Sequence, residues 1–245
     1  MGSEMCIRDS YYTPMGAIAM NSKPTIYAPL RVVLYAIPVV AAALVIERDA
    51  GTPVDGLKFG ESSNTELMQQ FFLLFTCIAF LTTGLFSKSH KAITYLLGGC
   101  VLVALIRELD TYFDQIYHGA WFPVASLIGA ITIFSVWRRR KKIWGNLEEF
   151  FSTPAFGIIL SGFLSVFIFS RIFGSKNVWR ALFDVEQLGA TQRWVKNAAE
   201  EGSELFGYTL LLIAAVEFFV HVVQPLWIKD TPEDKAWLVQ QLTPR

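Results

Sequence analysis

The sequence predicts an all-α, polytopic integral membrane protein, built as a bundle of six membrane-spanning helices. Two observations predict this class: six long apolar runs, and a content of 53% hydrophobic residues over 245 positions. A helix needs about 20 apolar residues to cross a hydrocarbon core of roughly 30 Å, and soluble strands do not reach that length. The runs are 30–46, 67–86, 92–106, 121–137, 155–173 and 205–223.

Local signals mark where several of these helices begin and end. Ser63 and Glu66 form a capping-box pattern ahead of the second run. Thr153 and Pro154 supply an N-cap and a first-turn proline ahead of the fifth run, and Pro225 follows the sixth. These signals support helix boundaries close to the ends of the apolar runs.

The chain divides into three segments around one membrane domain. Residues 1–29 are expected to be disordered or artefactual, because residues 5–10 read Met-Cys-Ile-Arg-Asp-Ser and resemble translated sequencing-adaptor DNA. Residues 30–225 hold the six helices. Residues 226–245 are expected to form a short cytoplasmic tail helix.

Positive charges predict the orientation in the membrane. Five consecutive basic residues follow the fourth run, namely Arg138, Arg139, Arg140, Lys141 and Lys142. The loops on the opposite side have fewer basic residues in their short connections and collect most of the acidic ones. Because basic loops stay in the cytoplasm, both termini are expected there, in a cell membrane that best fits a bacterial inner membrane.

Apolar residues at helical spacing follow the basic run. Ile143, Trp144, Leu147, Phe150 and Phe151 would share one side of a short helix. We expect this helix to lie on the inner membrane surface, with its apolar side among the lipid headgroups and the five cations on anionic headgroups. The segment is interpreted either as a topology anchor or as a lipid-binding site.

Charged residues gather at the outer ends of the third, fifth and sixth runs. Charges inside the hydrocarbon cost roughly 2.5–3.5 kcal/mol each on insertion scales, so they are the default candidates for function. Helical spacing puts Arg107, Asp110, Asp114 and His118 on one face of a continued third helix. The predicted cluster comprises Arg107, Glu108, Asp110, Asp114, Arg171, Glu204 and Tyr208. We expect its arginines to pair with its carboxylates, in either a structural network or a pocket for a substrate, cation or proton.

A second candidate lies deeper in the sixth run. Glu217 stands more than ten residues inside it, next to Phe218, and His221 follows one turn later on the same face. A carboxyl group at this depth must be protonated, paired or in contact with water. It is therefore interpreted either as a functional group or as a structural interhelical hydrogen-bonding residue.

Small residues recur at every fourth position of the fifth run. Gly157, Ser161 and Ser165 would let another helix approach closely. This face is expected to pack either inside the bundle or in a homo-oligomer.

Composition and motifs argue against several functional classes. The 21 basic residues balance the 21 acidic ones, which argues against nucleic acid as a partner. The three histidines lack metal-ligand spacing, and no nucleotide or serine-hydrolase fingerprint occurs, so no metal or other cofactor is expected. The favoured function is a small transporter or channel-like protein for a cation, proton or small polar solute. The alternatives are a membrane enzyme acting on a lipid at the outer leaflet, and a non-catalytic assembly subunit.

Overall fold

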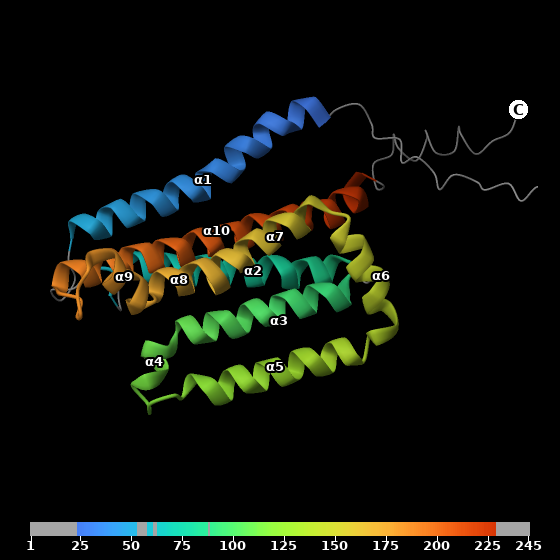
Figure 1. Ribbon diagram of the computed structural model, residues 1–245. Coiled ribbons are helices and arrows are strands. Elements are labelled where there is room, and N and C mark those ends of the chain that lie inside the picture. Colours follow the sequence, from blue (N-terminus) through green and yellow to red (C-terminus); the bar gives the residue numbers. More distant parts are fainter. Residues whose placement is uncertain (1–23, 53–57, 61–62, 88, 229–245) are drawn as a thin grey trace, which may run out of the picture. The chain divides into compact units, whose positions relative to one another are not determined.

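The computed structural model describes residues 24–52, 58–60, 63–87 and 89–228, and every regular element in this part is a helix (Figure 1). The elements are α1 (Pro24–Gly51), α2 (Asn64–Phe86), α3 (Lys91–Glu108), α4 (Asp110–Asp114), α5 (Trp121–Trp137), α6 (Arg140–Phe151), α7 (Pro154–Leu164), the π-helix η1 (Ser165–Phe169), α8 (Ser170–Gly174), α9 (Lys176–Phe183) and α10 (Ala190–Ile228). The chain divides into two compact units, 1–36 and 37–245. The described part of the first unit is the beginning of α1, and the second unit holds all the other helices. The prediction of an all-helical protein is confirmed.

Two predicted segments lie largely outside the described residues. The adaptor-like residues 5–10 are among them, although α1 already begins at Pro24, before the predicted start of the first run. Residues 226–228 of the predicted tail belong to α10, and the rest of that tail is not described.

Four helical stretches are long and apolar enough to cross a membrane. They are Pro29–Gly51 of α1, α2, the continuous stretch Pro154–Gly174, and Ala190–Val223 of α10. A fifth is obtained if α5 and α6, which meet at a bend of 96°, are taken together as one span. Length and composition thus support a membrane protein with four or five spans.

Helices α2 and α10 form the centre of the second unit. Helix α2 packs against α3 and α10, α7 packs on α10, and α3 packs against α5. The Phe218 ring of α10 lies 6.5 Å from the Phe80 ring of α2 and 5.1 Å from the Phe150 ring of α6, centroid to centroid. All three rings are buried. Between helices in lipid, such van der Waals packing takes over much of the role that the hydrophobic effect has in water.

Helices α7 and α10 cross at two glycines. A Cβ atom on Gly207 would lie 2.5 Å from Cγ2 of Val166 and 2.9 Å from the carbonyl oxygen of Gly162. The Ser165 hydroxyl donates to the Ser203 carbonyl oxygen at 2.9 Å, just beyond this crossing. The backbones therefore approach as closely as small residues allow.

Two side chains, the Ser63 hydroxyl and the Asp49 carboxylate, accept hydrogen bonds at the N-terminus of α2. Ser63 is the N-cap, and its side chain accepts a hydrogen bond from the Glu66 N–H at 3.2 Å, which confirms this part of the capping-box prediction. Asp49, near the end of α1, accepts from the Thr65 N–H and the Thr65 hydroxyl at 2.6 Å each. A carboxylate at a helix N-terminus also interacts favourably with the helix dipole.

Helix α6 turns away from α5 and contacts α3 and α7. The helix itself is where the sequence predicts it, but its apolar residues do not all face outwards. Phe150 is buried and Leu147 packs against the core, whereas Trp144 is 77% exposed. The expectation that the whole apolar side lies among headgroups is wrong, because bundle packing takes up part of it.

Candidate functional site

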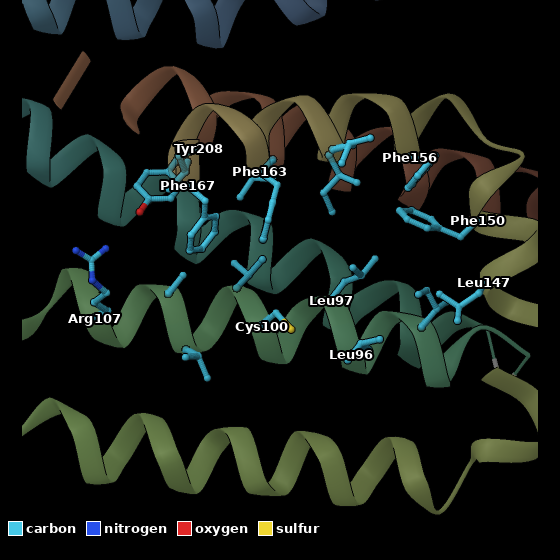
Figure 2. Close-up of a pocket in the computed structure, with 18 of the residues that line it drawn as sticks. Leu96, Leu97, Cys100, Arg107, Leu147, Phe150, Phe156, Phe163, Phe167 and Tyr208 are labelled. Carbon is cyan, nitrogen blue, oxygen red and sulfur yellow. The ribbon is translucent and has the colours of Figure 1, made fainter. Parts of the chain in front are cut away.

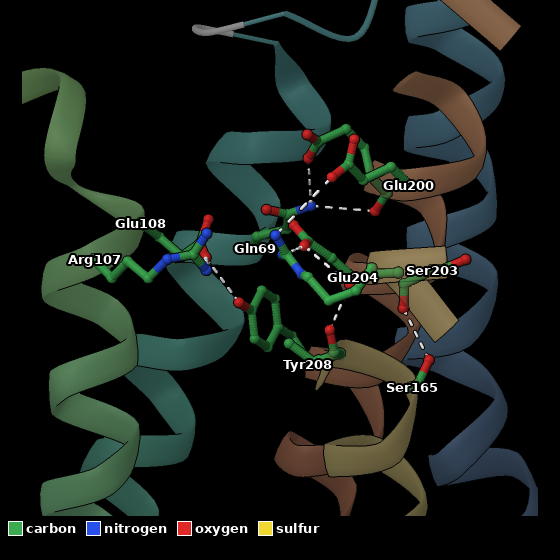
Figure 3. Close-up of polar contacts among 12 residues, drawn as sticks. Gln69, Arg107, Glu108, Ser165, Glu200, Ser203, Glu204 and Tyr208 are labelled. Atoms are coloured by element: carbon green, nitrogen blue, oxygen red, sulfur yellow. Dashed lines mark hydrogen bonds and ion pairs between the residues drawn. The ribbon is translucent and has the colours of Figure 1, made fainter. Parts of the chain in front are cut away.

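Four helical segments bring polar side chains together at one end of the bundle (Figure 3). They are the first turns of α2, the last turn of α3, α8, and residues 196–208 of α10. We call this group the glutamate cluster, and it consists of Gln69, Gln70, Arg107, Glu108, Ser170, Arg171, Lys196, Glu200, Glu201, Glu204 and Tyr208. The structure thus brings together five of the sequence-predicted residues, namely Arg107, Glu108, Arg171, Glu204 and Tyr208.

Glu108 joins α3 to α2 and α10. Its carboxylate accepts a hydrogen bond from the Tyr208 hydroxyl at 2.8 Å, and Arg107 approaches the same oxygen at 3.3 Å. The Gln70 side-chain amide donates to the Glu108 carbonyl oxygen at 3.1 Å. The Glu108 side chain is 12% exposed, whereas that of Arg107 is 49% exposed. The Glu108 carboxyl group is therefore held inside the bundle, and the guanidinium of Arg107 is the more exposed partner.

Arg171 makes the corresponding pair between α8 and α10. It forms an ion pair with Glu204, whose side chain is 6% exposed, and lies 4.0 Å from Glu200. The Ser170 hydroxyl lies 3.1 Å from the same Glu204 oxygen. The wider turn of η1 directly precedes these two residues and shifts their register along the helix. The predicted pairing of the arginines with neighbouring carboxylates is confirmed.

Removing Arg171 should destabilise the protein clearly more than removing a comparable surface arginine. Arg171→Ala leaves the buried Glu204 carboxylate without its cation, which should lower the free energy of unfolding by roughly 1–3 kcal/mol once solvent screening of the half-exposed guanidinium is allowed for. Arg180→Ala on α9 removes an exposed arginine and serves as the control. Thermal unfolding in detergent measures both, and equal, small shifts would show that the Arg171 pair contributes nothing.

Gln69 is a member of the cluster that the sequence prediction missed. It is fully buried, and its amide N–H group donates to the Glu201 carbonyl oxygen at 3.2 Å and to the Glu201 carboxylate at 3.0 Å. Its side-chain oxygen accepts no hydrogen bond from the described residues. The available signal was a pair of glutamines, Gln69 and Gln70, inside an otherwise apolar run. The Gln69 side-chain oxygen, which lacks a donor in the described part of the chain, and the Glu201 carboxylate thus lie side by side in the bundle.

Asp110 and Asp114 do not join the glutamate cluster. Asp110 is exposed at the start of α4. Asp114 accepts hydrogen bonds from the Gly119 N–H at 2.8 Å and binds His118 at 2.9 Å. The Gly119 hydrogen bond and the contacts with His118 lower the pKa of Asp114. A carboxylate with a lowered pKa stabilises the folded turn at pH values above the ordinary carboxyl pKa. The stabilisation is lost as the pH falls through the lowered pKa of Asp114.

Glu217 lies inside the bundle, some distance along α10 from the cluster. It is 6% exposed and precedes Phe218, whose ring packs against those of Phe80 and His90. His221 is exposed and does not share this burial, although helical spacing places both on one face. The structure therefore buries Glu217, as its place in the sixth run predicts, and leaves His221 on the outside of the bundle.

Further buried polar side chains lie along the same helices. We call them the polar seam, which comprises Gln69, Thr76 and Thr83 of α2, Thr94 of α3, and Glu204, Thr209 and Glu217 of α10. On α2 they recur at every seventh position, which keeps them on one face. Thr94 of α3 faces α2, because a Cβ atom on Gly84 would lie 2.6 Å from its hydroxyl oxygen. Oxygen atoms are thus buried at several levels of an apolar bundle.

Within the described residues, no three His, Cys, Asp or Glu side chains gather closely enough to hold a metal ion. Comparison of the chain with family models, curated proteins and solved structures finds no match.

Proposed function

We propose that this protein moves a proton or a small cation across a membrane. The observation that carries the proposal is the polar seam, whose side chains are all at most 6% exposed. Polar and ionisable groups inside a membrane helix bundle are costly, and they commonly mark ion or proton pathways. The glutamate cluster would be the entry site and Glu217 the carboxyl group at depth.

The threonines of the seam favour a positively charged substrate. Each threonine hydroxyl donates to a carbonyl oxygen one turn earlier in its own helix: Thr76 to Phe72, Thr83 to Ala79, Thr94 to His90 and Thr209 to Leu205. Since the single donor of each hydroxyl is used, what remains is oxygen lone pairs. The side-chain oxygen of Gln69 also lacks a hydrogen-bond donor among the described residues, so the seam offers hydrogen-bond acceptors. Acceptor oxygens suit a hydrated proton or a hard cation and not an anion.

The charge of the cluster agrees with this preference. Arg107, Arg171 and Lys196 pair with Glu108, Glu204 and Glu200 respectively, and the Glu201 carboxylate receives its hydrogen bond from the neutral amide of Gln69. With all seven groups ionised, three positive and four negative charges leave a net charge of −1 at the cluster. Among the described residues of the cluster, the carboxylate without a basic partner is that of Glu201, and this is where the cluster would take up a cation or a proton.

Purified protein in lipid vesicles gives the direct test. A potassium gradient with valinomycin imposes a membrane potential, and a pH-sensitive dye inside reports proton entry, while sodium and potassium uptake are followed separately. We expect one of these three fluxes to exceed that of empty vesicles. Equal fluxes with and without protein, for all three ions, would contradict the proposal.

We also propose that α3 and α5 each cross the membrane, which gives six spans with both termini in the cytoplasm. Helix α5 has 17 residues and none is charged, and the charged residues of α3 lie in its first and last turns. At 1.5 Å per residue, both are about 25–27 Å long, close to the hydrocarbon thickness. Helix α6, at 96° to α5, would then lie along the cytoplasmic surface, with the basic run on anionic headgroups.

Cysteine labelling in intact cells tests this topology. After replacement of Cys6, Cys77 and Cys100 by alanine, single cysteines are placed at Gly145 of α6 and Asn177 of α9. Both positions are exposed, and a Cβ atom at Gly145 meets nothing within 4 Å, whereas the neighbouring Asn146 is buried. An impermeant maleimide should label the cysteine at 177 in intact cells, and the one at 145 only after lysis. Labelling of both from outside would refute the proposed orientation.

A further inference from the structure

The second unit contains an apolar cavity of about 730 Å³ between α3 and α7 (Figure 2). Leu97 and Cys100 of α3 form one wall, and Phe163 and Phe167 of α7 and η1 form the other. Tyr208 and Leu211 of α10 and Phe150 of α6 also line it. The cavity is separate from the polar seam, because its lining is almost entirely hydrocarbon.

The cavity exists because α3 and α7 pack on different partners. Helix α3 packs against α2 and α5, whereas α7 packs on α10, and α6 contacts both α3 and α7 at one end. The α7 side of the gap presents large apolar side chains: Phe163 is 51% exposed and Phe167 is 55% exposed. In a bilayer, an apolar gap of this size is filled by hydrocarbon, since neither water nor an empty void makes favourable contacts with such a lining.

The shape of the cavity suits an extended chain. Its lining runs from Phe156 to Arg171 along one continuous helical stretch, which is about 22 Å long at roughly 1.5 Å per residue. This direction follows the helix axes. An acyl chain aligned with those of the surrounding bilayer would therefore fit between the walls.

One end of the cavity is cationic. Arg107 of α3 and Tyr208 of α10 lie at this end (Figure 2). Arg171 of α8 also lines the cavity, at the end of the helical stretch that begins with α7. Among the described residues the two arginines are the only charged side chains in the lining. Their partners Glu108 and Glu204 are the more deeply buried members of each pair, so an occupant meets the guanidinium groups first. Trp121 lines the cavity as well, and tryptophan is typical of the headgroup level.

We propose that this cavity binds one acyl chain of an anionic phospholipid, whose phosphate lies against Arg107 and Arg171. Each guanidinium has five N–H donors in a planar fork that matches phosphate oxygens, and one or two carboxylate contacts leave donors free. The side chains are 49% and 45% exposed, which keeps these donors accessible. The proposal does not require ion transport: it shares Arg107, Arg171 and Tyr208 with the glutamate cluster, but it uses neither Glu217 nor the threonines of the seam.

Native mass spectrometry of the delipidated full-length protein in detergent tests this site. Phosphatidylglycerol should bind about tenfold more tightly than phosphatidylcholine with the same acyl chains, because only its headgroup carries a net negative charge for the two arginines. Arg107→Gln should remove most of this preference. Ala104→Trp, which places a large ring in the cavity lining, should weaken binding of both lipids while both arginines remain.

Controls separate the cavity from other lipid contacts. Lys141→Gln with Lys142→Gln, in the basic run, should leave the phosphatidylglycerol preference at the cavity unchanged, and Glu217→Gln should bind lipid like the unaltered protein. Equal binding of the two lipids, or full binding by Ala104→Trp, would overturn the proposal. Competition by inorganic phosphate at the same affinity as the lipid would also overturn it, since the site would then be one for a free anion.

Discussion

Glu217→Gln should abolish the proposed flux while the protein stays folded. Glutamine keeps the size of the side chain and its ability to form hydrogen bonds, but it cannot exchange a proton or carry a negative charge. Glu217 is buried next to Phe218, so a substitution that keeps its shape should disturb the packing little. In reconstituted vesicles we therefore expect flux at the level of empty vesicles.

The matched control is Glu148→Gln on α6, which makes the same chemical change at an exposed position. Its flux should equal that of the unaltered protein. Thermal unfolding in detergent shows whether either variant has lost structure. A Glu217→Gln protein with full flux would mean that Glu217 is an interhelical hydrogen-bonding residue only. It would contradict the proposal that the polar seam is an ion or proton pathway.

The helical membrane class could be predicted because it depends on composition along the chain. The six apolar runs correspond to α1, α2, α3, α5, the stretch from α7 to α8, and α10. The pairing of Arg171 with Glu204 was also predictable, since both stand at the same level of neighbouring runs and unpaired charges at that depth are costly. These inferences need only residue type and distance from a helix end.

Other features depend on tertiary contacts that no local pattern encodes. The face of Gly157, Ser161 and Ser165 was predicted to pack in the bundle or in a homo-oligomer. Ser165 does contact α10, whereas a Cβ atom on Gly157 would meet nothing within 4 Å. The closest approach uses Gly162 with Gly207, because the residues of the partner helix decide which small side chains meet. The role of Gln69 was missed for a similar reason, since its partner Glu201 lies 132 residues away in the sequence.

Gly207→Leu should disrupt the crossing of α7 and α10. Even a Cβ atom there would lie 2.9 Å from the Gly162 carbonyl oxygen, and a backbone atom cannot move aside as a flexible side chain can. Overpacking in a well-packed core typically costs about 1–3 kcal/mol, and we expect a larger loss here because the helices themselves must separate. The measurement is thermal unfolding in detergent, followed by far-ultraviolet circular dichroism.

Gly157→Leu is the control for this change, because it adds the same side chain to α7 where the surrounding space is open. Its unfolding temperature should stay close to that of the unaltered protein, and equal losses in the two variants would contradict the assigned crossing. The crossing also positions Arg171 against Glu204, since Ser165 and Ser203 connect the same two helices one turn away. Arg171→Ala should therefore cost less stability in the Gly207→Leu background than alone, because separated helices have already weakened the ion pair that the arginine would lose.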